Sequence, residues 1–460
     1  MRPLALLLTA LALVPGCRPS DAPEPSPDAT ATVSPSFPNE DTVLYEVFVR
    51  NFSEEGTFAA VTARLDSLQA LGVNTLWLMP IHPISEAERK GTLGSPYAIQ
   101  DYKAVNPLLG SEDDFRALVE AAHAREMKVI LDWVANHTGW DHAWATDHPA
   151  YYTRDAAGEI MIPHNDDGTP TDWTDVADLD YSNPEVRAAM IDALAYWVRE
   201  FDIDGYRCDV AGMVPNDFWT EALAELRAIK PVFMLAEWST ADLHTEAGFD
   251  ATYGWSRYGR LKEVWNGDAT AQSLVDLVIE EETTTFPEGA LRMNFTTNHD
   301  ETAWDETPLA LFGGAGGARA ASTAMLLLPG FPLVYNGQEF ADPQRIPLFE
   351  KQPIQREQGE AGTTMRAFFD DLLDLRASHE AFVEGTASTV AHDQPETVIA
   401  YRLTHGDTAM LVVTNTRPEA VTVTLEAAPE GAESVFGTGT LNGATVALPA
   451  HGYSVLRTDG

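Results

Sequence analysis

Short apolar runs that fit buried β-strands alternate with helical patterns over most of the chain, and this alternation constrains its fold more than any other feature. Between these runs, apolar residues recur three or four positions apart, as one buried face of a helix requires. Eight strand candidates occur, at residues 42–48, 73–80, 128–133, 204–211, 231–237, 249–253, 292–297 and 331–335. Strand followed by helix, repeated eight times, predicts an α/β protein with a closed (β/α)8 barrel, the TIM barrel.

Capping residues predict where two of the helices begin and end. Residues 58–71 carry apolar side chains at helical spacing and predict one helix, which Gly72 would end. Ser111, followed three residues later by Asp114, fits a capping box at the start of a helix running to about Glu126.

The alternation stops in two places, and these breaks predict domain limits. Residues 139–182 are polar, aromatic and irregular, which predicts a short domain inserted after the third strand. From about residue 382 the pattern becomes short alternating strands, which predict an antiparallel β-sandwich. The predicted units are a signal peptide (1–16), a lipidated cysteine with a disordered tether (17–38), the barrel (39–138 and 183–381), the inserted domain (139–182) and the C-terminal β-sandwich (382–460).

The first residues predict export and a membrane anchor. Arg2 precedes an apolar run from Leu4 to Val14, which has the form of a signal peptide and is too short for a membrane-spanning helix. The run ends in a sequence resembling the bacterial lipoprotein signal, with Cys17 as the lipidated first residue of the mature protein. Because Arg18 follows, the outer membrane is the expected location. A plain secretory signal with a chance cysteine is the alternative.

The charge balance narrows the classes of partner. The chain has 29 basic and 70 acidic residues and a formal net charge of -41. Such a surface repels a phosphate backbone, so nucleic-acid binding is disfavoured. The only cysteines are Cys17 and Cys208, and they predict neither a disulfide nor a metal site.

Polar residues gather where the predicted strands end. Arg207 and Asp209 lie two positions apart in the fourth strand candidate and would therefore point to the same side. Alone, they fit a structural ion pair as well as a nucleophilic carboxylate that its arginine keeps ionised. The other strand ends carry Tyr97, Asp132, Asn136, His137, Glu237, Asn298, His299 and Asp300. Since these ends form one rim of a barrel, we expect a catalytic site there.

Four segments at these strand ends are similar, in the same order, to the four conserved regions of the α-amylase family, glycoside hydrolase family 13. They are Asp132–His137, Gly205–Asp209, Ala236–Trp238 and Phe295–Asp300. Gly94–Tyr97, Ala177–Asp180 and Gly330–Tyr335 also resemble family landmarks. The resemblance covers roughly residues 40–460 and includes the terminal sandwich.

The resemblance implies retaining hydrolysis of α-glucosidic bonds by three carboxylates. Asp209 would be the nucleophile, Glu237 the general acid and base, and Asp300 the group that holds sugar hydroxyls and stabilises the transition state. Retention needs two carboxyl groups about 5 Å apart, one ionised and one protonated. Arg207 is expected to favour the ionised form of Asp209, whereas burial beside Trp238 would favour the protonated form of Glu237.

The resemblance also implies supporting roles. His137 and His299 would bind hydroxyls of the cleaved sugar, and Tyr97 would stack under its ring. Their alternatives are buried structural histidines and an aromatic residue at the rim. Asp132, linked to Arg207, would support the site from behind, and Asn298 would support it too.

Two positions depart from the family pattern. Gly212 and Met213 stand where family amylases carry lysine and histidine. This departure resembles neopullulanases, cyclomaltodextrinases and α-glucosidases, and predicts preference for short malto-oligosaccharides or cyclodextrins with some tolerance of α-1,6 bonds. Packing of the turn is the alternative explanation. No cofactor is expected for the chemistry, but Asn136 and Asp178 match ligand positions of the family's structural calcium ion.

The sequence therefore predicts a lipid-anchored hydrolase of α-glucans or malto-oligosaccharides. A transglycosylase of the same family is the nearest alternative, because it forms the same intermediate and passes it to a sugar. A non-catalytic carbohydrate-binding protein is the alternative from another class, and the three carboxylates argue against it.

Overall fold

The computed structural model describes residues 41–165, 167–427 and 431–459. The predicted signal peptide, Cys17 and the tether of residues 17–38 lie outside the described residues. Within the described ranges, no helix has both the length and the apolar character needed to cross a membrane.

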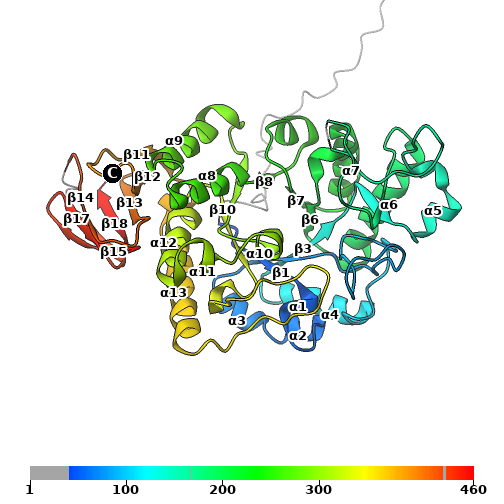
Figure 1. Ribbon diagram of the computed structural model, residues 1–460, viewed down its shortest axis with the longest axis horizontal. Coiled ribbons are helices and arrows are strands. Elements are labelled where there is room, and N and C mark those ends of the chain that lie inside the picture. Colours follow the sequence, from blue (N-terminus) through cyan, green and yellow to red (C-terminus); the bar gives the residue numbers. More distant parts are fainter. Residues whose placement is uncertain (1–40, 166, 428–430, 460) are drawn as a thin grey trace, which may run out of the picture. The chain divides into compact units, whose positions relative to one another are not determined.

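Eight parallel strands close into a barrel, which confirms the predicted fold class (Figure 1). They are β1 (Leu44–Val47), β2 (Thr75–Leu78), β3 (Lys128–Trp133), β6 (Gly205–Cys208), β7 (Phe233–Ala236), β8 (Ala251–Tyr253), β9 (Leu291–Asn294) and β10 (Phe331–Tyr335). Each strand pairs with the next in this order, and β10 returns to β1 with Leu333 opposite Leu44. Nearly every strand residue is buried, which explains the continuous apolar runs in the sequence.

Helices follow the strands. They are α1 (Val49–Phe52), α2 (Phe58–Thr62), α3 (Leu65–Ala70), α4 (Glu112–His123), α6 (Pro184–Phe201), α7 (Asn216–Ile229), α8 (Trp255–Asn266), α9 (Gln272–Glu280), α10 (His299–Trp304), α11 (Pro308–Leu311), α12 (Gly314–Leu326), α13 (Gly359–Ala377) and α14 (Glu380–Val383). Their buried faces pack with the strands in one continuous hydrophobic core.

One helix prediction is confirmed at its start and another is wrong. The Ser111 hydroxyl accepts from Asp114 N at 3.2 Å and the Asp114 carboxylate accepts from Ser111 N at 2.8 Å, so the capping box is present. Residues 58–71 form two helices rather than one. At the break, the Thr62 hydroxyl donates to Phe58 O at 2.9 Å, a local bond of the kind that destabilises and bends helices.

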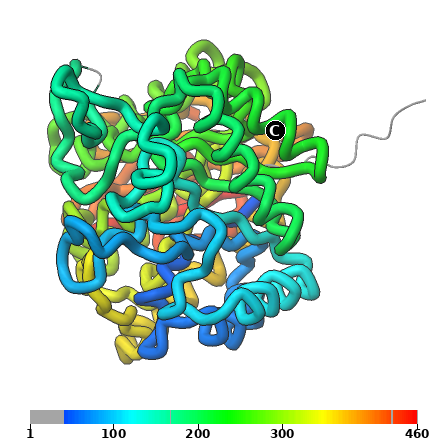
Figure 2. The backbone as a smooth tube through the Cα atoms, turned by 90° about the vertical axis from the view of Figure 1, so that its right-hand side faces the viewer, coloured from blue at the N-terminus to red at the C-terminus, as the bar shows by residue number. Residues whose placement is uncertain are grey.

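The insertion after β3 begins and ends in a two-stranded ribbon. It contains β4 (His137–Gly139), α5 (Ala143–Asp147) and β5 (Val176–Asp178), and β4 and β5 pair antiparallel with His137 opposite Asp178. The tube view shows this teal segment at one edge of the barrel (Figure 2). The ribbon ties the insertion to the end of β3, where Asn136 lies.

The C-terminal region forms two antiparallel sheets, as predicted. One has the order β11 (Thr386–Thr389), β12 (Val398–His405), β13 (Thr408–Asn415), β18 (Tyr453–Asp459) and β15 (Glu433–Gly437); the other has the order β14 (Val421–Thr424), β17 (Thr445–Leu448) and β16 (Thr440–Asn442). Apolar side chains of both sheets share a core of their own. The buried Tyr401 hydroxyl donates to Ala324 O of α12 at 3.1 Å and fixes the sandwich to the barrel.

Candidate active site

A cavity of about 600 Å³ opens at the carboxyl ends of the barrel strands. Six residues that the sequence singles out line it: Tyr97, His137, Asp209, Glu237, His299 and Asp300. They come from the segments that follow β2, β3, β6, β7 and β9. The barrel therefore brings together residues that lie more than two hundred positions apart in the sequence.

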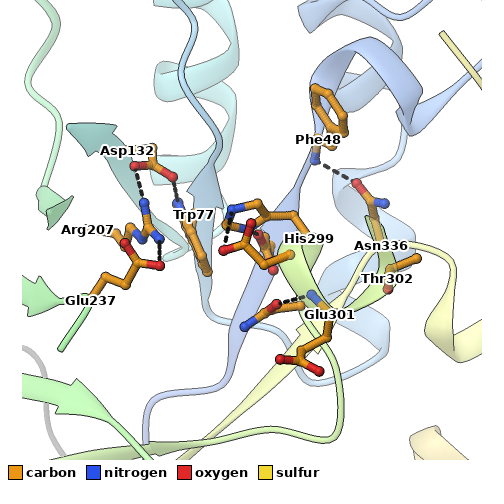
Figure 3. Close-up of polar contacts among 12 residues, drawn as sticks. Phe48, Trp77, Asp132, Arg207, Glu237, His299, Glu301, Thr302 and Asn336 are labelled. Carbon is orange, nitrogen blue, oxygen red and sulfur yellow. Dashed lines mark hydrogen bonds and ion pairs between the residues drawn. The ribbon is translucent and has the colours of Figure 1, made fainter. Parts of the chain in front are cut away.

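Arg207 lies behind the cavity and contacts three carboxylates. Its Nη1 lies 2.8 Å from Asp132 Oδ1 and 3.0 Å from Asp209 Oδ1, and its Nη2 lies 2.8 Å from Glu237 Oε1. Figure 3 shows the guanidinium between Asp132 and Glu237. Its side chain is 0% exposed. Trp77 Nε1 donates to the other Asp132 oxygen at 3.0 Å, so Asp132 is held on both sides.

These contacts correct the sequence argument about Arg207. The arginine was expected to favour ionised Asp209 in particular, but it lies equally close to Glu237. Burial and the charge of Glu237 raise the pKa of Asp209 well above its usual range, against the effect of Arg207. Burial also raises the pKa of Glu237, although Arg207 and a 2.7 Å hydrogen bond from Val210 N lower it. The two carboxylates therefore titrate as a pair that holds a proton more tightly than free carboxylates do.

The two histidines that line the cavity, His137 and His299, differ in charge. Burial lowers the pKa of His137 to about 3, so its ring is neutral. Burial also lowers the pKa of His299, but the carboxylates of Asp300 and Glu46 raise it more, to about 9. His299 Nδ1 lies 2.5 Å from Glu46 Oε1, and its Nε2 lies 3.3 Å from Asp300 Oδ2. His299 is therefore a cation at neutral pH and holds Asp300 by charge.

Tyr97 connects His299 to Asp132. Its hydroxyl lies 2.7 Å from His299 Nε2 and donates to Asp132 Oδ2 at 3.2 Å. The two rings stack with centroids 5.5 Å apart. Asn298 starts α10 by accepting from Glu301 N at 2.9 Å, which positions the turn that carries His299 and Asp300.

Several residues of the site carry little or no signal in the sequence. Glu46 is the clearest case, and its only signal is a single carboxylate inside the apolar strand β1. Val210, which follows Asp209 in the fourth strand candidate, also lines the cavity. The remaining lining residues lie away from the predicted strand ends; Val176 begins β5 and Trp304 ends α10. They are Lys90, Ser95, Asp172, Trp173, Asp175, Val176, Trp304, Leu348 and Phe349.

The predicted calcium ligands do not by themselves make a calcium site. The Asn136 amide lies 3.4 Å from His137 Nδ1, and burial raises the pKa of Asp178 to about 6. Among the described residues, no three His, Cys, Asp or Glu side chains gather as a metal would require. Calcium takes six to eight oxygens, so one carboxylate and one amide fall short.

Comparison with known proteins decides the family. The α-amylase catalytic-domain model matches residues 34–246. The crystal structure of an α-amylase from Lactobacillus plantarum is 32% identical, with a TM-score of 0.79, and the match covers 91% of this chain and 99% of that one. This chain belongs to the α-amylase family. A noncanonic maltogenic α-amylase from Thermotoga neapolitana is also 32% identical, with a TM-score of 0.76 over 91% of this chain and 97% of that one.

Curated relatives of the α-amylase family are longer. α-Amylase MalA of Haloarcula japonica is 32% identical over 86% of this chain, but the chain spans only 58% of that protein's length. A cyclomaltodextrinase of a Bacillus species is 26% identical over 78% of this chain and 65% of its own length.

One of the two unusual positions after Asp209, Gly212, is explained by packing. A Cβ on Gly212 would lie 2.4 Å from the indole of Trp238, so the close ring excludes a larger side chain. Among the described residues, the lining of the cavity includes Val210 but neither Gly212 nor Met213. For Gly212, this contact fits the alternative explanation, in which the residue packs the turn.

Proposed function

We propose that this protein is a retaining glycoside hydrolase that cleaves α-glucosidic bonds, mainly α-1,4 with some α-1,6, in malto-oligosaccharides or related α-glucans. The observation that carries the proposal is the joint placement of Asp209, Glu237 and Asp300 on one cavity above a buried arginine. Family membership supports it.

The reaction follows from the paired carboxylates. Asp209 attacks the anomeric carbon while Glu237 gives its proton to the leaving oxygen, and a covalent glycosyl ester forms. Glu237 then takes a proton from water, which attacks the same carbon and frees Asp209 with the configuration retained. Arg207 is placed to stabilise whichever of the two is ionised, because it contacts both.

The other lining residues bind the sugar whose bond is cut. Asp300, oriented by His299, accepts hydrogen bonds from hydroxyls as positive charge develops on the ring. His137 is neutral and can donate or accept, and Tyr97 offers an aromatic face.

The direct test is to digest starch, pullulan, maltotriose and isomaltose with the purified protein and to follow the anomer of the first product by NMR. We expect the α-anomer first, and mass spectrometry after reaction with an activated fluorosugar should find the label on Asp209. A β-anomer, or a label elsewhere, would contradict the assignment.

Transglycosylation is the second candidate, and one relative favours it. An α-1,4-glucan:maltose-1-phosphate maltosyltransferase of Rhodospirillum rubrum is 30% identical over 66% of this chain and 45% of its own length. Adding maltose as an acceptor distinguishes the two reactions: a transglycosylase makes longer products at the expense of glucose and maltose release.

Two further features are proposed with this function. Cys17 carries lipid and holds the enzyme at the outer membrane; the motif ending in Cys17 supports this, and an N-terminal peptide without acyl chains would contradict it. Asn136 and Asp178 would contribute oxygen ligands to a structural calcium ion; the family resemblance supports this. An unchanged melting temperature after dialysis against EDTA and readdition of calcium would exclude it.

A further inference from the structure

We propose that a bridge of residues 90–93 closes one end of the cavity, so that the enzyme removes short units from non-reducing chain ends instead of cutting within chains. The inference rests on the proposed hydrolase function and names its mode of attack. It is carried by contacts on both sides of this short segment.

On one side, the bridge is tied to the inserted domain. Lys90 Nζ lies 3.1 Å from Asp175 Oδ1 and donates to Asp172 O at 2.7 Å. The Asp175 side chain is only 5% exposed and that of Lys90 is 27% exposed. An ion pair with one buried partner is screened less by water than a surface pair, so it holds the two loops together.

On the other side, the bridge is tied to the segment after β10. Glu350 Oε1 accepts from Thr92 N at 2.8 Å and from Thr92 Oγ1 at 3.0 Å, and Leu93 N donates to Phe349 O at 3.0 Å. The buried Arg50 also connects the two segments, because its Nη1 donates to Gly94 O at 3.1 Å and to Leu348 O at 3.2 Å. The segment therefore joins two walls of the cavity that come from distant parts of the chain.

We place this bridge on the side of the sugar that is transferred to the enzyme. Glu237, the proposed proton donor, marks the side of the leaving group. Tyr97, which would stack under the transferred sugar, lies against His299 and belongs to the same loop as Lys90 and Ser95, and these three loop residues all line the cavity. Because Lys90 and Phe349 both line the cavity, a glucan that extended beyond it would have to break the contacts described above. The number of units released is then the number that the cavity holds.

If one end of the cavity is closed, short malto-oligosaccharides remain expected substrates, but cyclodextrins do not. Malto-oligosaccharides with a free non-reducing end fit a cavity with one closed end. A cyclodextrin has no chain end, so we expect slow cleavage of the ring.

The test compares 4-nitrophenyl maltoheptaoside with the same compound blocked at its non-reducing end. Wild type should release one short product from the free substrate and should cut the blocked one at least about a hundredfold more slowly. Lys90→Met combined with Asp175→Asn removes the ion pair without leaving a buried charge. This variant should raise the rate on the blocked substrate about tenfold or more. Lys103→Met with Asp192→Asn removes an exposed ion pair away from the cavity and should behave as wild type.

The outcomes separate the two proposals. If wild type cuts neither substrate, the proposed hydrolase function fails. If wild type cuts both equally and gives a ladder of products, only the closure is wrong. In the third outcome, wild type prefers free ends, but neither the ion-pair variant nor the double variant Thr92→Ala with Glu350→Gln gains activity on the blocked compound. The bridge then does not cause the preference, and the inference is overturned.

Discussion

The two ends of strand β6 carry buried aspartates in opposite electrostatic settings. Asp204 precedes the strand and contacts one histidine and two lysines: His123 Nε2 at 2.7 Å, Lys230 Nζ at 3.3 Å and Lys128 Nζ at 3.4 Å. Asp209 follows the strand and shares a single guanidinium, that of Arg207, with two other carboxylates.

The difference in charge balance sets the direction of each pKa. Burial alone raises the pKa of Asp204, but hydrogen bonds from His123 and Val129 N–H and the charge of Lys230 lower it below its usual value. Asp209 is also buried, yet its pKa is raised because burial and the charge of Glu237 outweigh Arg207. Asp204, before β6, therefore stabilises the fold, whereas Asp209, after β6, belongs to a carboxylate pair that holds a proton for the reaction.

The largest expected effect comes from removing a charge at the catalytic end. Asp209→Asn and Glu237→Gln should each lower kcat/KM on maltotriose by about 10⁴-fold or more, because the nucleophile or the proton donor is lost. Each change also relieves repulsion among three carboxylates, so the melting temperature should stay constant or rise. A loss of activity that follows a loss of folded protein would contradict the comparison.

Asp204→Asn should have the opposite result. It removes a buried carboxylate that binds two lysines and a histidine, and it should lower the free energy of unfolding by about 2 kcal/mol, with kcat/KM unchanged at 25 °C. Because the folded-state pKa is depressed, this stability is present above the unfolded pKa of about 3.9 and disappears as the pH falls through the folded pKa. Urea unfolding at pH 7 and in steps below pH 4 measures it. The gap to wild type should shrink at low pH, and a constant gap would contradict the proposed cause.

Glu46→Gln tests the charge on His299, and its expected effect is smaller. The pKa of His299 is about 9 because Asp300 and Glu46 raise it against burial. The charge that holds Asp300 is therefore present below that pH and is lost as the pH rises through it. Removing one carboxylate should move the alkaline limb of kcat/KM down by about one pH unit, with little change near pH 6.

Glu339→Gln is the matched control for that experiment. Glu339 is also buried and accepts from the hydroxyl of Tyr45, the β1 neighbour of Glu46, at 2.6 Å. Since the contacts of its carboxylate are with Tyr45 and Gly337, not His299, its variant should keep the alkaline limb of wild type. A shift of equal size in both variants would show that Glu46 acts through packing alone.

Most features that depend on residues close together in the sequence could be predicted from it, whereas features that depend on contacts between distant segments could not. The barrel was predictable because its strands are almost entirely buried and read as largely apolar runs, and Asp209, Glu237 and Asp300 could be grouped because strand ends meet at one rim. The break between α2 and α3 was not predictable from apolar spacing, because a single hydroxyl contact of Thr62 accompanies it.

Contacts between distant segments had no signal in the sequence. Glu46 contacts His299 across 253 positions, and Thr92 contacts Glu350 across 258. The contact of Arg207 with both Asp209 and Glu237 could not be predicted either. Residue spacing along β6 relates Arg207 to Asp209, but it gives no information about Glu237 at the end of β7.

Lys230→Ala should have the smallest effect on stability of these variants, and it tests how much one lysine contributes to the stabilisation of Asp204. Lys230 Nζ contacts Asp202 Oδ1 at 2.6 Å and Asp204 Oδ1 at 3.3 Å, and its side chain is 24% exposed. His123 and Lys128 remain beside Asp204 in this variant, so no buried charge is left unpaired. We expect a loss of less than about 1 kcal/mol in urea unfolding, as for partly exposed ion pairs, and no change in kcat/KM. The loss should fall further in 1 M NaCl, because salt screens exposed charges. A larger, salt-independent loss would mean that Lys230, Lys128 and His123 stabilise Asp204 as one unit, and that the other two cannot replace Lys230.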